Sequence, residues 1–178
     1  MRYRLDIVAA SVADVVTSAG GWMFDRVMAG WDVTVLIAAG EDVRPIQILG
    51  ADTLDLETAL GMWSQRPHPH TLAVSADLFT RDSRIRKGVL EALEHGTTEV
   101  TLWGESWPTE LERTVDSVQH PLSGAARAFK AQALNALAEP TASVGSSEVF
   151  RSGVRTGLSV AADLIPASWH AALELKAR

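Results

Sequence analysis

A strand, a helix and a second strand follow one another within the first forty residues, and this order constrains the fold more than any other feature. Residues 5–10 are apolar apart from Asp6 and predict a buried strand. Apolar residues then recur at helical spacing from Val12 to Val27, and Gly30 stands where a helix commonly ends. Residues 33–38 predict the next strand. We expect these two strands to run parallel, because a parallel pair needs a long crossover connection such as a helix.

The same alternation continues along the chain. Apolar runs over residues 71–75 and 99–103 predict two more strands of a core sheet. Residues 46–50 form a shorter run, which is either an edge strand or a small excursion from the core. Helices are predicted over residues 56–63, from a cap at Ser83 to Gly96, over 108–118 and over 123–137.

These elements predict one α/β fold. Parallel strands need cover on both faces, so we expect a three-layer α/β/α sandwich with a mainly parallel sheet of four or five strands, Rossmann-like or flavodoxin-like. Residues 30–37 resemble the junction between the first helix and the second strand of many Rossmann-like proteins. We expect residues 1–140 to form the core domain. Residues 141–178 are expected to form a flexible segment, rich in Ser, Thr and Gly over 141–153, and then a C-terminal helix over 168–176.

Composition excludes several classes of protein. The chain has 178 residues and no cysteine, which excludes a disulfide framework, a thiolate metal site and a cysteine nucleophile. Its formal net charge of −6 argues against nucleic acid as a partner. No stretch approaches the roughly 20 apolar residues of a membrane-spanning helix, and the N-terminus lacks the apolar core of a signal peptide. We therefore expect a cytoplasmic protein with no membrane association; its oligomeric state is left open.

Small and acidic residues follow the predicted strands. In open α/β sheets, ligands bind beyond the carboxyl ends of the strands. The residues expected there are Ser11, Ser75, Asp77, Glu105 and Trp107. Trp107 could stack on a flat ligand. The alternative is that the Ser and Asp residues only cap helices and that the indole packs at the rim of the core.

Two other features suggest an anion site. Arg84 and Arg86 stand near the start of a predicted helix, where a bound phosphate or carboxylate would offset the unfavourable cations. The alternative is a solvated helix face. Gly20 and Gly21 cost roughly 1 kcal/mol each inside a helix, so either a close ligand or tight helix–sheet packing requires them. We favour packing for the glycines and a solvated face for the arginines.

The sequence lacks the motifs that would specify a cofactor or a reaction. It has no G-x-G-x-x-G, no phosphate-binding loop with G-K-[ST] and no G-x-S-x-G elbow, so the cofactor is left unknown. His68 and His70 flank Pro69, but nothing fixes a third ligand, and no metal site is predicted.

Two hypotheses for function remain. The favoured one is a non-catalytic binding or regulatory module that engages a protein partner or a small anion. The alternative is a small enzyme that acts on a phosphorylated or nucleotide-like substrate at the carboxyl edge of the sheet. In that case Arg84 and Arg86 would hold the phosphate.

Overall fold

The structure is a computed structural model that describes residues 2–105, 109–111, 116–137, 143–153 and 163–167. Its strands are β1 (Arg4–Val8), β2 (Asp32–Ile37), β3 (Asp52–Asp55), β4 (Thr71–Ser75), β5 (Glu99–Trp103), β6 (Asp116–Pro121), β7 (Ser147–Gly153) and β8 (Ile165–Pro166). Its α-helices are α1 (Val12–Met28), α2 (Arg44–Ile48), α3 (Leu56–Gly61), α4 (Ala76–Arg81), α5 (Ser83–His95) and α6 (Gly124–Asn135). Two 3₁₀ turns, η1 (Trp63–Gln65) and η2 (Thr109–Leu111), complete the described elements.

The strands form one mixed sheet with the order β3-β2-β1-β4-β5-β7-β6-β8. The first five strands in that order pair in parallel, and the last three are antiparallel to their neighbours. The α/β class and the parallel core are therefore confirmed. The expected sheet of four or five strands is too small, because the described residues form a sheet of eight strands that includes an antiparallel extension.

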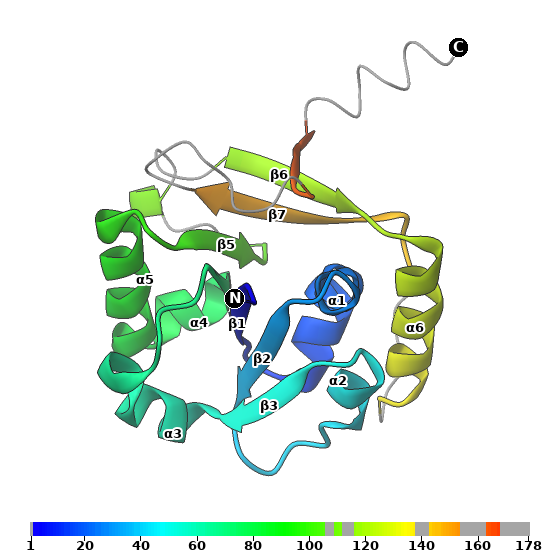
Figure 1. Cartoon of the computed structure of the whole chain (residues 1–178), viewed down its shortest axis with the longest axis horizontal. Helices are drawn as coiled ribbons and strands as arrows, with labels where there is room; N and C mark the ends of the chain where they lie inside the picture. The colour runs from blue at the N-terminus through cyan, green and yellow to red at the C-terminus, as the bar shows by residue number, and fades with distance from the viewer. Residues whose placement is uncertain (1, 106–108, 112–115, 138–142, 154–162, 168–178) are drawn as a thin grey trace.

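Helices cover both faces of the sheet, as Figure 1 shows: α1, α2 and α6 lie on one side and α3, α4 and α5 on the other. Two hydrophobic cores follow from the alternation of side chains along each strand. Ile7 packs with α1 in the first core, whereas its neighbour Val8 packs with α3, α4 and α5 in the second. Both side chains are fully buried.

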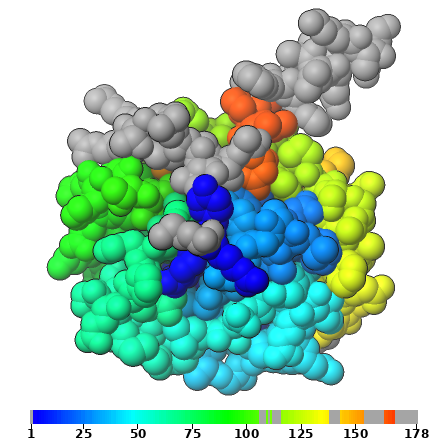
Figure 2. Space-filling model, viewed as in Figure 1, coloured from blue at the N-terminus to red at the C-terminus, as the bar shows by residue number. Residues whose placement is uncertain are grey.

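The start of the chain lies across the middle of the face shown in Figure 2, in dark blue between the segments of α3 to α5 and those of α1 and β2. Tyr3 stacks on Trp31 with 5.0 Å between ring centroids and meets His70 edge-on at 4.9 Å. These contacts join the segments before β2 and β4 to the first residues of the chain.

Residues 46–50 belong mostly to the short helix α2, which has Pro45 in its first turn, so the structure supports the excursion and not the edge strand for this run. Three other local predictions are wrong. Where the structure describes the range of the helix predicted over 108–118, it has η2 and the start of strand β6 instead. The loop predicted over 141–153 contains strand β7 from Ser147 onward. Asp82, one residue before Ser83, caps α5.

The helix predicted over 168–176 lies outside the described residues. The division of the chain at residue 140 stays a prediction, since residues 138–142 and 168–178 are not described. Among the described residues, no helix has the length and apolarity needed to cross a bilayer.

Candidate functional site

The parallel strands bring the predicted edge residues to one side of the sheet. Val8 at the end of β1 pairs with Leu36 in β2 and with Val74 in β4, and Ser75 pairs with Trp103 in β5. The segments that follow β1, β2, β4 and β5 therefore leave the sheet at the same edge. Strand order reverses between β1 and β4, which is where open α/β sheets bind ligands.

A polar cluster occupies the start of α1 at this edge. The Ser11 hydroxyl accepts a hydrogen bond from the Asp14 backbone N–H at 3.1 Å and so caps the helix. The Glu41 carboxylate, which follows β2, accepts from the Val12 N–H at 2.7 Å. An acid at a helix N-terminus is favoured by the partial positive charge there. Two of the free N–H groups that a bound anion would use are thus already taken.

Asp14 is the member of this cluster best suited to chemistry. Its side chain is half-buried, and the Trp103 indole N–H lies 3.1 Å from both of its carboxylate oxygens. Trp103 is 1% exposed, so the indole fixes the carboxylate from within the core. A carboxylate that is held in place and still reaches solvent can accept or donate a proton.

Ser75 ends β4 on the other side of the switch point. It is buried at the N-cap position of α4, and its side chain makes no capping bond. The next turn along the edge contains Gly104, whose φ of 131° is a conformation that favours glycine. A Cβ on Gly104 would lie 3.2 Å from the Cβ of Ala76, so the turns after β4 and β5 pack closely together.

The other predicted edge residues are exposed or outside the description. Asp77 lies in the first turn of α4 and forms an ion pair with Arg81, four residues on. Glu105 is exposed beyond β5. Trp107 lies outside the described residues.

Arg84 is engaged by carboxylates of the protein itself. Its guanidinium donates to Glu57 at 2.8 and 2.9 Å and to Asp82 at 2.7 Å. These bonds hold the pKa of Glu57 and the pKa of Asp82 below their ordinary values. Arg86 is exposed on α5 and has its own interactions with the protein. The cationic run is therefore a set of surface ion pairs, which supports the solvated-face alternative.

Gly20 and Gly21 lie in the middle of α1, away from the edge. Both are buried, and a Cβ on Gly21 would lie 2.5 Å from the Leu122 side chain. The Gly21 and Trp22 N–H groups donate to the carboxylate of Glu148 at 2.8 Å each. The packing alternative therefore accounts for these glycines, and the structure does not bring them to the other candidate residues.

Sequence reasoning did not single out Asp14 or Glu41, although both acids stand in segments that follow predicted strands. That position was the signal that could have found them. The helix predicted over 108–118 also implies a place for His120 at a helix C-terminus, whereas His120 lies in β6 with its ring 2.8 Å from the Asp25 carboxylate. Asp25 also accepts a 2.6 Å bond from the Ser123 hydroxyl.

Within the described ranges, no group of three or more His, Asp or Glu side chains is placed to hold a metal ion. In particular, the His70 ring accepts from the Arg4 backbone N–H at 3.0 Å through Nδ1, so it does not join His68 as a ligand pair.

The sequence matches no protein-family model and no curated protein. Solved structures share its fold. A pseudoaglycone deacetylase has a TM-score of 0.59 at 16% identity, over 89% of this chain and 100% of that one. A deacetylase in complex with teicoplanin has a TM-score of 0.59 at 12% identity, over 85% and 98%. The 4-carboxy-2-hydroxymuconate hydratase from Pseudomonas putida has a TM-score of 0.60 at 12% identity, over 89% and 98%.

At these identities the likeness shows the fold alone. These solved structures are nevertheless enzymes, and this finding speaks against the favoured hypothesis of a non-catalytic binding or regulatory module. The enzyme alternative is the better supported of the two.

Proposed function

We propose that this chain is a small enzyme of the hydrolase or hydratase type, with its active centre at the carboxyl edge of the parallel strands. The observation that carries the proposal is the Asp14 carboxylate, half-buried at the β1–β4 switch point and held by the Trp103 indole. The three solved structures described above are two deacetylases and a hydratase. Hydrolytic deacetylation and hydration both consume water, so a positioned base that activates water would serve either reaction.

In the proposed reaction Asp14 accepts a proton from water while the water oxygen forms a bond to an electrophilic carbon of the substrate. In hydrolysis the proton then passes from Asp14 to the departing group. In hydration it passes to the carbon next to the one attacked. General base catalysis of this kind contributes about 10²–10⁴-fold to a rate.

The charges at this edge favour a neutral or cationic reacting group over a phosphate. Glu41 and Ser11 already accept hydrogen bonds from backbone N–H groups at the start of α1. Arg84 is paired with Glu57 and Asp82. The phosphorylated substrate of the alternative hypothesis therefore loses its support, whereas an amide, ester or activated alkene keeps it.

The test is turnover by the whole chain and by Asp14→Asn. We would measure acetate release from N-acetylated amino sugars, p-nitrophenolate release from p-nitrophenyl acetate, and loss of ultraviolet absorbance by conjugated unsaturated acids. We expect turnover in at least one assay and a loss of about 10²–10⁴-fold in kcat for Asp14→Asn. Asn can still accept from the Trp103 indole, so the melting temperature should be retained.

Asp77→Asn is the matched control, since Asp77 is an exposed acid at the same edge that pairs with Arg81. It should leave kcat unchanged. Absence of turnover in all three assays, or equal kcat for wild type and Asp14→Asn, would contradict the proposal.

A further inference from the structure

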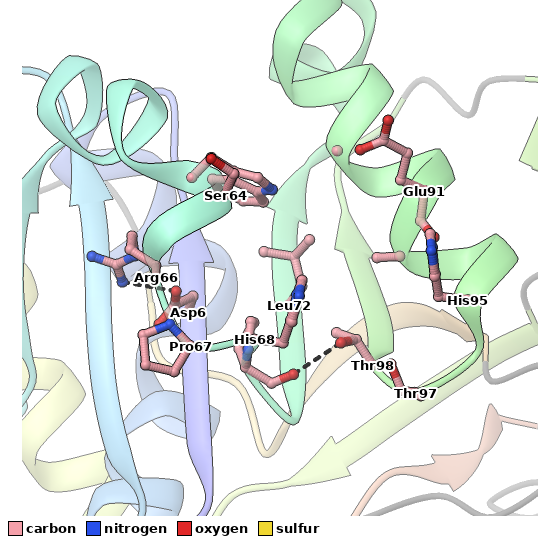
Figure 3. A pocket seen from close by; sticks show the side chains of 14 residues that line it. Asp6, Ser64, Arg66, Pro67, His68, Leu72, Glu91, His95, Thr97 and Thr98 are labelled. Carbon is pink, nitrogen blue, oxygen red and sulfur yellow. Dashed lines mark hydrogen bonds and ion pairs between the residues drawn. The ribbon is translucent and has the colours of Figure 1, made fainter.

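A pocket of about 280 Å³ lies away from the Asp14 cluster, where β4 and β5 begin. Residues 66–69 before β4 line it on one side, and residues 97–98 before β5 close its base. In Figure 3, Asp6 and Arg66 lie on one side of the pocket, and Glu91 and His95 lie on the other. Ligand pockets start at roughly 300 Å³, so this one suits a molecule with a single ring.

The pocket is formed before any ligand enters, because hydrogen bonds fix the segment beside it. Arg66 forms an ion pair with Asp6 at 2.8 Å, and Arg4 donates to the Pro67 carbonyl at 3.2 Å. The Thr98 hydroxyl donates to the Pro69 carbonyl at 2.9 Å, as the dashed line in Figure 3 shows. A preformed pocket avoids most of the cost of ordering on binding.

One wall of the pocket is flat and apolar. The Trp63 indole lies against α5 at Gly88, where an added Cβ would be 3.3 Å from the indole ring. The absence of a side chain at Gly88 lets the helix approach the ring. Leu72 and Ala92 continue this apolar surface. A planar ring would stack here, since aromatic pairs prefer offset or edge contacts with large buried area.

The side that contains Arg66 favours an anion. Asp6 lies between Arg66, which lines the pocket, at 2.8 Å and Arg4, which does not line it, at 3.3 Å, so these three side chains together carry an excess of one positive charge. His68 is exposed beside them, and its ring has no hydrogen-bond partner in the part of the chain that the structure describes. Guanidinium and imidazole N–H groups bind carboxylates with charge-assisted hydrogen bonds.

The opposite side offers acceptors. The Glu91 carboxylate is 51% exposed, with Lys87 3.8 Å away. The His95 Nδ1 lies 2.7 Å from the Glu91 backbone carbonyl, which can only accept, so Nδ1 donates to it. In a neutral ring this leaves Nε2 as an acceptor. A hydroxyl or amino group at the far end of a ring would find partners here.

We propose that this pocket binds a small aromatic carboxylate with a hydrogen-bond donor opposite its acid group. The carboxylate binds on the side of Arg66 and His68, the ring lies against Trp63, and the donor faces Glu91 and His95. The site is independent of the proposed reaction at Asp14.

The test is calorimetric titration with 4-hydroxybenzoate, supported by the shift in melting temperature. We expect 4-hydroxybenzoate to bind and 4-hydroxybenzamide, which has no charge, to bind at least about tenfold more weakly. Trp63→Leu should weaken binding by about tenfold through loss of the stacking surface. His68→Gln, at an exposed position that should not affect folding, should weaken it by about fivefold.

Gln65→Ala is the matched control, because Gln65 is exposed next to the lining residues and does not line the pocket. It should bind 4-hydroxybenzoate as the wild type does, and so should Asp14→Asn. No heat and no thermal shift with 4-hydroxybenzoate would overturn the proposal. So would equal affinity for the acid and the amide, or unchanged affinity in both His68→Gln and Trp63→Leu.

Discussion

Arg84 contacts two carboxylates at once, Glu57 from α3 and Asp82 at the start of its own helix. All three side chains reach solvent, and exposed ion pairs of this kind contribute little to stability. Their effect is therefore best seen in the titration of the acids. The bonds from Arg84 are the largest cause that lowers the pKa of Glu57 and the pKa of Asp82.

Arg84→Ala should raise the pKa of Glu57 and the pKa of Asp82 towards their ordinary values. In the wild type both acids have a lower pKa folded than unfolded, so the pairs favour the folded state above the unfolded pKa. That contribution is lost as pH falls through the folded pKa. Carboxyl-carbon NMR titration measures both pKa values directly. Lys87→Ala, which removes a cation paired with Glu91, should leave them unchanged. An unaltered Glu57 titration in Arg84→Ala would contradict the assignment.

At the scale of elements, α1 is the helix whose sequence is hardest to explain by propensity. In a regular α-helix the N–H groups of Gly21 and Trp22 donate to the carbonyls of Thr17 and Ser18. Here Glu148 of β7 accepts from both N–H groups, and the Lys130 ammonium of α6 donates to the Thr17 carbonyl at 2.6 Å. The glycines give α6 and β7 access to the backbone of α1.

Gly21→Ala should destabilise the protein by about 1–3 kcal/mol, because the new methyl group would overlap Leu122. Gly124→Ala is the matched control in the first turn of α6, where an added Cβ meets nothing within 4 Å. It should stabilise the protein by about 0.4–1 kcal/mol through the unfolded chain. Urea unfolding measures both changes. Equal effects of the two substitutions would show that Gly21 is not needed for packing.

At the scale of the whole molecule, four of the five parallel strands were predictable, whereas the short parallel strand β3 and the antiparallel part of the sheet were not. β1, β2, β4 and β5 are runs of buried apolar residues, so the strands and their common edge follow from the sequence. In β7 the inward residue Glu148 is charged and the outward residue Val149 is 60% exposed, which reverses the usual pattern. β6 similarly buries Gln119 and His120.

The candidate site was likewise predictable only in part. Ser11, Ser75 and Glu105 could be placed at one edge because parallel strands end together. The partners of Asp14 and Arg84 could not be predicted, because Trp103 and Glu57 are distant in sequence and only the packing of the helices selects them.

The Lys130–Glu148 pair joins three elements that are distant in sequence. Lys130 of α6 and Glu148 of β7 are 2.6 Å apart and at most 5% exposed, and together they bind the backbone of α1. Burial raises the pKa of Glu148, while Lys130 and the α1 N–H groups act to lower it. The charged form of the Glu148 carboxylate is therefore stabilised by Lys130 against the cost of burial.

Lys130→Met and Glu148→Gln should each destabilise the protein by about 3–5 kcal/mol, because each leaves one buried charge without its partner. The double variant leaves neither charge unpaired in the core. We therefore expect the double variant to lose less than the sum of the singles, with a coupling of about 0.5–3 kcal/mol. Lys87→Met, in an exposed pair with Glu91, should change stability by no more than about 0.5 kcal/mol. Additive losses in urea unfolding would mean that the two charges act separately, and the pair would then not be what holds α6 and β7 to α1.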